Sequence, residues 1–142
     1  MQWFEVGGDR VAFRVTSAES DGAMTAIEVR MAPGGGPPAL HRHDPCELYR
    51  VERGRLTLYV EDGRGGVRRI VAGPGDVVTI PGGAEHTIRN ESSEEAHALA
   101  VFSPGAPMEG FIRAAASAAP AEVPALAERH GIAMTRPLAE AA

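Results

Sequence analysis

The chain has a single cysteine, Cys46, among its 142 residues, so it cannot form an internal disulfide bond. Its stability must come from a hydrophobic core, and one free thiol is compatible with a reducing compartment. Aromatic residues are also scarce, at 5% of the chain. Hydrophobic residues of all kinds reach 44%, however, which is enough for the core of one ordinary domain.

Long apolar runs and clusters of positive charge are missing as well. No stretch approaches the roughly 20 consecutive apolar residues of a membrane helix. The first ten residues, MQWFEVGGDR, carry acidic and polar side chains where a signal peptide needs an apolar run. The net charge is -5, and phosphate binding requires concentrated basic residues. We therefore expect a soluble, cytoplasmic protein with no nucleic-acid or membrane partner.

Glycine and proline are abundant, with 17 and 11 residues, and they separate short apolar or alternating segments. This pattern is typical of strands joined by turns. We expect strands at residues 3–6, 10–15, 24–31, 40–51, 56–60, 67–71, 77–80, 85–90 and 96–102. Many short strands at even spacing predict an all-β sandwich or barrel.

The character of the chain changes after the SPGAP segment at residues 103–107. Apolar residues then recur at helical spacing in two stretches, formed by Phe111, Ile112 and Ala115 and by Val123, Leu126, Ala127 and His130. Gly131 stands where a helix C-cap is expected. We predict a barrel at residues 1–105 and a helical extension at residues 106–142 that packs on it.

A candidate metal site lies in the segment 40–51. His41, His43 and Glu47 are separated by even numbers of residues, so on one strand they share a face and can converge. Imidazole and carboxylate groups together are typical ligands of divalent metals. His86, in a second glycine-framed block, is the candidate for a fourth ligand.

These two blocks resemble the two signature motifs of the cupin superfamily. The first motif, G-x5-H-x-H-x3/4-E-x6-G, is met at Gly35, His41, His43, Glu47 and Gly54. The second motif, G-x5-P-x-G-x2-H-x3-N, is met at Gly75, Pro81, Gly83, His86 and Asn90. The tail from residue 110 to residue 132 also resembles the helical tail of small quercetin-dioxygenase-like cupins.

The resemblance implies a jelly-roll β-barrel with a metal held by His41, His43, Glu47 and His86. Such a ligand set suits Fe, Mn, Ni, Cu, Co or Zn, and four protein ligands leave one or two positions open for a substrate oxygen or O2. The resemblance gives Asn90 a structural role. It also implies a homodimer, formed through the N-terminal strands or the C-terminal helices.

Several side chains have two interpretations. Glu47 is either a ligand alone or a ligand that also acts as a catalytic base. Tyr49 either lines the substrate pocket or belongs to the core of the barrel wall. Cys46 is out of phase with the ligands and should point away from the metal as a small buried residue. For His97 a surface position is the simpler interpretation, and for His130 a role in stabilising a helix end.

The leading functional hypothesis is a metal-dependent dioxygenase that acts on a small aromatic or oxygen-rich organic substrate. A metal-dependent isomerase or cyclase is the alternative within the enzymes. A non-catalytic cupin that binds a metal and a small ligand is the alternative outside them, because one fold hosts many functions.

Overall fold

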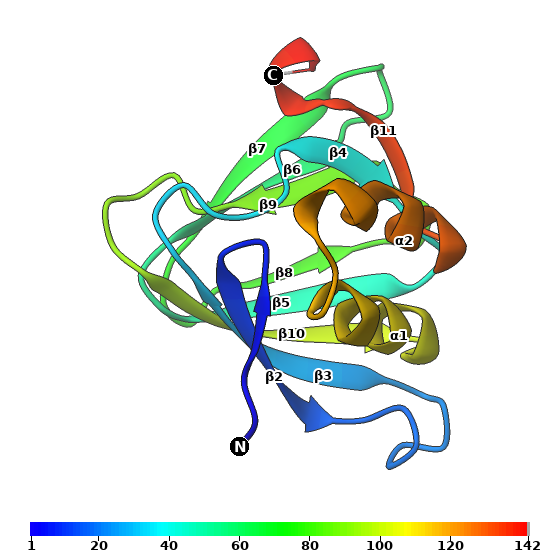
Figure 1. The fold of residues 1–142 in the computed structure, drawn as a ribbon. Helices are drawn as coiled ribbons and strands as arrows, with labels where there is room; N and C mark the ends of the chain where they lie inside the picture. The colour runs from blue at the N-terminus through cyan, green and yellow to red at the C-terminus, as the bar shows by residue number, and fades with distance from the viewer. Residues whose placement is uncertain (142) are drawn as a thin grey trace.

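The computed structural model describes residues 1–141, which form two antiparallel β-sheets packed face to face (Figure 1). The first sheet has six strands in the order β1-β2-β3-β10-β5-β8. Their bounds are Phe4–Val6 for β1, Asp9–Val15 for β2, Thr25–Met31 for β3, Ala96–Ser103 for β10, Cys46–Arg53 for β5 and Val77–Ile80 for β8.

The second sheet has five strands in the order β11-β4-β9-β6-β7. Their bounds are Ala133–Pro137 for β11, Ala39–Arg42 for β4, His86–Arg89 for β9, Leu56–Glu61 for β6 and Val67–Ala72 for β7. The chain crosses between the sheets several times. The two sheets and the short C-terminal helices confirm the predicted all-β jelly roll.

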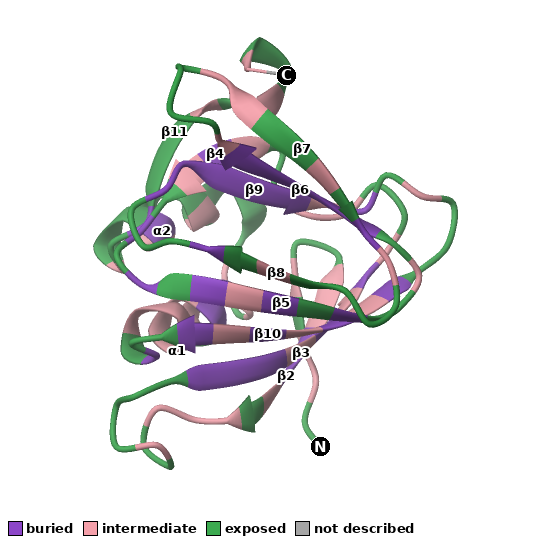
Figure 2. Ribbon diagram, turned by 180° about the vertical axis from the view of Figure 1, so that it is seen from behind, coloured by how far each residue is buried: buried purple, intermediate pink, exposed green. Residues whose placement is uncertain are grey.

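The core lies between the sheets, and alternation along the strands determines which side chains enter it. In β10 the buried residues are Ala96, Ala98, Ala100 and Phe102. Figure 2 shows the same alternation in β5, where Glu47, Tyr49 and Val51 are buried. The predicted inward face of this segment is therefore confirmed.

Two helices follow β10 and lie beside each other at one end of the sandwich (Figure 1). Helix α1 spans Ala106–Ala115 and buries Ile112 and Ala115, whereas α2 spans Val123–Arg129 and buries Ala127. A 3-10 turn at Pro120–Glu122 leads directly into α2. In the part of the chain that the structure describes, neither helix has the length and apolar character to span a membrane.

The end of α2 has the predicted glycine cap. Gly131 adopts a φ of +79°, a left-handed conformation that glycine accepts without strain. The Ile132 N–H then donates to the Ala127 carbonyl at 2.9 Å, and the Gly131 N–H donates to the Glu128 carbonyl at 3.0 Å. These two bonds form a Schellman motif, which turns the chain back toward the barrel.

The predicted C-terminal extension contains a strand that the sequence analysis missed. β11 pairs antiparallel with β4, with Met134 opposite His41 and Pro137 opposite Ala39. The extension thus returns to the five-stranded sheet instead of only covering the barrel. Residue 142 of the predicted extension lies outside the described residues, and the division at residue 105 stays a prediction.

The predicted single strand at residues 40–51 is wrong in one respect, because it is two strands in different sheets. β4 ends at Arg42 and β5 begins at Cys46. Pro45 lies between them, and proline fixes φ and lacks the N–H that would continue a ladder. Consequently His41 belongs to the five-stranded sheet and Glu47 to the six-stranded sheet.

Candidate metal centre

Four potential ligands from three strands and one turn converge between the two sheets. They are His41 of β4, His43 in the turn after it, Glu47 of β5 and His86 of β9. Each offers a ligand atom, and these atoms all lie within 4.8 Å of one another. The structure therefore brings together all four residues that the sequence analysis named as metal ligands.

Each imidazole is held by a backbone carbonyl two residues away. The Nδ1 atom lies 3.2 Å from the Ala39 oxygen in His41, 2.9 Å from the Pro45 oxygen in His43 and 2.7 Å from the Ala84 oxygen in His86. A carbonyl only accepts, so each Nδ1 carries the proton. In a neutral ring, Nε2 then presents a lone pair, the form in which histidine binds a metal.

The Nε2 atoms of His43 and His86 both lie beside one carboxylate oxygen, and that of His86 is within hydrogen-bond distance of it. Glu47 Oε1 lies 2.5 Å from Nε2 of His43 and 3.0 Å from Nε2 of His86. The His43 atom is not oriented for a hydrogen bond to this oxygen, and it is a buried nitrogen with no hydrogen-bond partner. A buried imidazole nitrogen without a partner, beside an ionised carboxylate and two further imidazoles, is an environment that a cation satisfies, so the donor set fits a metal ion.

The charges of the cluster follow from its burial and its contacts. Burial opposes the ionisation of Glu47, but the adjacent imidazoles of His43 and His86 outweigh it and lower its pKa to about 2. Burial, together with the nearby His86, lowers the pKa of His41 to about 4. Burial alone would lower the pKa of His86, but the Glu47 carboxylate raises it above its ordinary value.

The exposure of the ligands differs across the site. His43, Glu47 and His86 are buried, whereas His41 is only partly buried. The Phe102 ring packs edge-on to His43 with 6.5 Å between ring centroids. His41 is therefore the ligand nearest to solvent, and the buried Phe102 of the apolar core packs against His43.

Tyr49 is buried in the core beside this cluster. Its pKa is raised well above the ordinary value, first by burial and then by the neighbouring Glu47 carboxylate. The phenol is thus neutral and close to a proposed ligand. Its assignment to the substrate pocket stays a prediction.

Other residues singled out from the sequence lie away from the ligands. Cys46 points away as predicted, but it is exposed, not buried, because β5 turns its first residue to the surface. His97 contacts Glu95 on the outer face at 2.8 Å. His130 contacts the Leu126 carbonyl at the end of α2 at 2.9 Å.

Asn90, the last residue of the second motif, has the structural role that the resemblance implies. It is fully buried, and its amide group donates to the carbonyls of Met31 at 2.9 Å and Glu94 at 2.8 Å. Its own oxygen accepts from Ser92. The side chain thus fixes the turn that follows β9.

Three backbone carbonyl groups that orient the imidazoles were not predicted from the sequence. They belong to Ala39, Pro45 and Ala84, whose side chains carry no polar group. Their common position, two residues from each histidine, could have been found only with the local backbone in hand. The proline at position 45 was the one available signal, because it predicts a turn beside His43.

Comparison with known proteins agrees with the fold. The family model described as the cupin domain matches residues 27–102. No curated protein matches the chain in sequence. Among solved structures, a tryptophan-to-tyrosine variant of oxalate decarboxylase from Bacillus subtilis is 25% identical, with a TM-score of 0.63, over 73% of this chain and 27% of that chain.

Two further structures of this enzyme match in the same way. The enzyme at pH 4.6 is 25% identical with a TM-score of 0.63, over 73% of this chain and 27% of that chain. A serine-to-alanine variant has the same identity and TM-score, over 74% of this chain and 28% of that chain. The chain thus spans little more than a quarter of the length of these enzymes. Because the cupin model matches more than half of the chain and both motifs meet at one buried cluster, the chain belongs to the cupin family.

Proposed function

We propose that this cupin binds a divalent transition metal and uses it as a dioxygenase on a small aromatic or oxygen-rich organic substrate. The observation that carries metal binding is the arrangement of the Nε2 atoms of His43 and His86 around one oxygen of Glu47. The resemblance of the C-terminal tail to quercetin-dioxygenase-like cupins supports the oxygen chemistry. Fe, Mn, Ni, Cu, Co and Zn all suit the ligand set.

When bound, such a metal would act as a Lewis acid or redox centre at its open positions. His41, His43 and His86 would hold it with neutral rings, fixed by their carbonyl partners. Glu47 remains ionised well into acid, so it is available both as ligand and as base. Tyr49 would present a neutral hydroxyl beside the Glu47 carboxylate.

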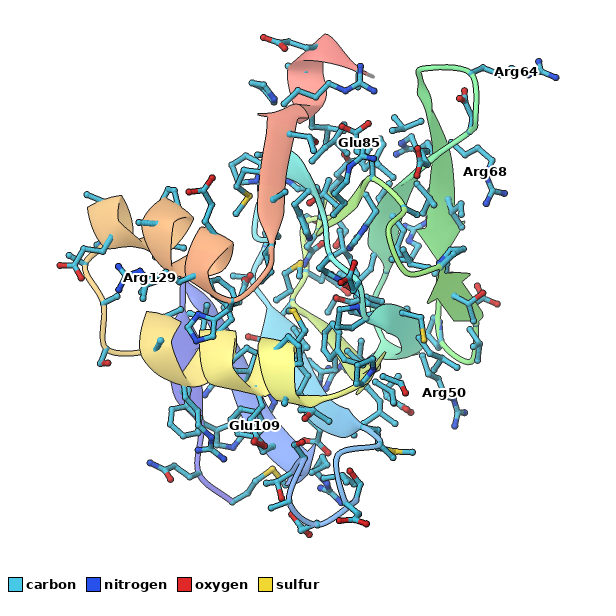
Figure 3. All side chains as sticks on the ribbon, turned by 90° about the vertical axis from the view of Figure 1, so that its right-hand side faces the viewer. Arg50, Arg64, Arg68, Glu85, Glu109 and Arg129 are labelled. Atoms are coloured by element: carbon cyan, nitrogen blue, oxygen red, sulfur yellow. The ribbon has the colours of Figure 1, made fainter. Side chains whose placement is uncertain are left out.

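The charge of the surroundings supports a neutral or singly charged substrate. The sequence has no lysine, and every arginine in the described residues is exposed or half-buried. Figure 3 shows Arg50 and Arg68 at the surface, away from the core. A divalent ion with three neutral imidazoles and one carboxylate carries a net charge of about +1. One negative charge would neutralise it.

A dianion such as oxalate would leave excess negative charge in apolar surroundings, where an unpaired charge is costly. The likeness to oxalate decarboxylase is therefore a likeness of fold, and we propose a different substrate class for this chain. A planar substrate with adjacent oxygen atoms, such as a catechol, a flavonol or a 1,3-diketone, fits the charge of the site.

Oxygen consumption tests the proposal. The protein is reconstituted with each of the six metals and supplied with catechol, a flavonol or a 1,3-diketone, and dissolved oxygen is followed with an electrode. We expect turnover with at least one combination of metal and substrate, and loss of this turnover in His86→Ala. Turnover without oxygen uptake would support the isomerase or cyclase instead. Saturable binding with no turnover would support the non-catalytic cupin.

We also propose that the protein is a homodimer, as the resemblance implies. Light scattering coupled to gel filtration measures the mass directly. A mass of twice 14.9 kDa is expected, and a single-chain mass would contradict the proposal.

A further inference from the structure

One buried carboxylate outside the ligand cluster has a contact network of its own. The side chain of Glu85 precedes His86 on the outer face of the five-stranded sheet and is only 7% exposed. We propose that Glu85 is a positioning residue of the metal centre, which holds His41 and His86 in place through Arg42 and Arg136. The inference rests on the metal binding proposed above and not on the oxygen chemistry.

β4 pairs with β9 in the five-stranded sheet. His41 and His86 are directly opposite each other in this antiparallel pair. Successive side chains alternate between faces, so their neighbours Arg42 and Glu85 lie together on the opposite face of the sheet. Arg42 Nη2 is indeed 3.9 Å from Glu85 Oε2. This ion pair therefore lies directly behind two proposed ligands.

Glu85 also contacts β11 through Arg136. Arg136 donates to both oxygens of Glu85, with Nη2 at 2.8 Å from Oε1 and Nε at 3.2 Å from Oε2. The Thr135 hydroxyl donates to the same carboxylate. Figure 3 shows Glu85 beside β11. A two-point arginine–carboxylate contact with a buried carboxylate is among the stronger and more directional polar contacts in proteins.

The ladder pairing of β4 itself is short. β4 has four residues, and its pairing with β9 consists of the single pair His41 and His86. Its other neighbour is β11, which pairs with it from Arg42 to Ala39. β11 is held in turn by Arg136, which also donates to the Gly65 carbonyl at 2.9 Å. Glu85 thus joins β9, β4 and β11 at one point behind the ligands.

Loss of the contacts that Glu85 makes should therefore affect metal binding. If the charge of Glu85 is removed, the contacts to Arg42 and Arg136 weaken, and β4 loses one of the interactions that fix its position relative to β9 and β11. His41 would then move relative to His86, and the ligand set would fit a metal less well. Groups that orient ligands typically change metal affinity by about 10- to 100-fold, and the indirect route favours the lower end.

The chain provides a matched control at the other end of β9. Glu91 contacts one arginine, Arg69 at 2.9 Å, where Glu85 contacts two, and like Glu85 it accepts from one hydroxyl group, that of Tyr59. It lies just beyond the end of β9, is more exposed than Glu85, and contacts residues of β6 and β7 instead of β4 and β11. Glu91→Gln therefore removes one negative charge from a similar network whose contacts are to β6 and β7, and not to β4, which carries His41.

The test is the affinity of full-length protein for Co²⁺, measured by competition with a chromophoric chelator, in wild type, Glu85→Gln and Glu91→Gln. We expect about tenfold weaker binding in Glu85→Gln, with a changed visible spectrum of the bound Co²⁺, and wild-type values in Glu91→Gln. A thermal melt of each metal-free variant reports stability separately. A Glu85→Gln affinity within about twofold of wild type would overturn the inference, as would equal weakening in Glu91→Gln.

Arg136→Gln covers the case in which Glu85→Gln does not fold. It leaves Arg42 in contact with the carboxylate, and the expected loss is several-fold, with the spectrum changed in the same direction. Wild-type affinity in Arg136→Gln would then overturn the inference. A wild-type protein that binds no Co²⁺ would overturn both this inference and the proposed function, whereas wild-type binding with unaffected variants would overturn this inference alone.

Discussion

The backbone carbonyl of Pro45 accepts a 2.9 Å hydrogen bond from Nδ1 of His43. The residue that ends β4 and redirects the chain into β5 thus also orients one of the proposed ligands. The turn is braced from outside by the next motif, because the Gly83 N–H donates to the His43 carbonyl at 2.8 Å. The two signature motifs are therefore in direct contact at the metal centre.

The first prediction concerns Gly82, which packs on this turn. A methyl group at Gly82 would lie 2.2 Å from the backbone oxygen of Asp44, far inside van der Waals contact. Gly82→Ala should therefore displace the turn that holds His43. We expect a loss of unfolding free energy of about 2 kcal/mol or more, together with weaker metal binding. Denaturant unfolding and Co²⁺ titration measure the two effects.

Gly73→Ala is the matched control for this variant. A methyl group at Gly73 would meet its nearest neighbour, the Arg55 side chain, at 3.8 Å, which is ordinary contact. Its stability should stay within about 0.5 kcal/mol of wild type and its metal affinity unchanged. Equal behaviour of the two variants would show that the turn at residues 43–45 is not constrained by Gly82.

The ligand residues could be predicted from the sequence, although the reason given for their convergence was incomplete. His41 and Glu47 were expected to share a face of one strand, whereas they face each other from two sheets. The even spacing holds because alternation continues on either side of Pro45, with Glu47, Tyr49 and Val51 all buried in β5. Periodicity reports which side chains turn inward, but it does not report which sheet a strand joins.

β11 could not be predicted for a related reason. Its residues are mostly exposed, with only Arg136 half-buried, so they lack the alternation of a half-buried strand. The strand exists because β4 offers a free edge and because Arg136 contacts Glu85, a residue 51 positions earlier. A partner so distant in sequence leaves no local pattern. The helix cap at Gly131 depends on local geometry alone and was predicted correctly.

The second prediction is that metal affinity decreases as the pH is lowered, because His86 becomes protonated. Glu47 raises the pKa of His86 in the metal-free protein, so a proton must leave Nε2 before this atom can bind a metal. Below that pKa the affinity should fall about tenfold per pH unit, with release of about one proton per metal bound. Calorimetry in buffers of different ionisation enthalpy measures the proton. Affinity independent of pH between about 6 and 9 would contradict the assignment.

The third prediction concerns the acid stability of the metal-free protein. The pKa of His41 is lowered from 6.5 to about 4. Between these pH values the imidazole is therefore protonated in the unfolded chain but neutral in the folded protein. The contribution of His41 to stability should therefore fall as the pH drops from about 6.5 to 4, by on the order of 2–3 kcal/mol, whereas the raised pKa of His86 acts in the opposite direction. In His41→Gln this slope should be reduced. An identical slope in wild type and variant, measured by denaturant unfolding across this range, would argue against it.

The fourth prediction separates the two interpretations of Tyr49. Tyr49→Phe keeps the buried ring and removes only the hydroxyl beside Glu47. If the hydroxyl contacts the substrate, catechol binding to the metal-loaded protein should weaken by about 5- to 10-fold while Co²⁺ affinity is kept, as for one lost hydrogen bond. If Tyr49 serves only the core, both affinities should match wild type. Optical titration of the Co²⁺ protein with catechol distinguishes these outcomes.

Metal content tests the central claim most directly. Untagged wild type, Glu47→Gln and His86→Ala are purified in parallel, and their metals are measured by elemental analysis, before and after reconstitution. We predict about one transition-metal ion per wild-type chain, a reduced content in Glu47→Gln and near-complete loss in His86→Ala, whose ring is a proposed ligand. A wild-type protein that holds no metal even after reconstitution would contradict the account.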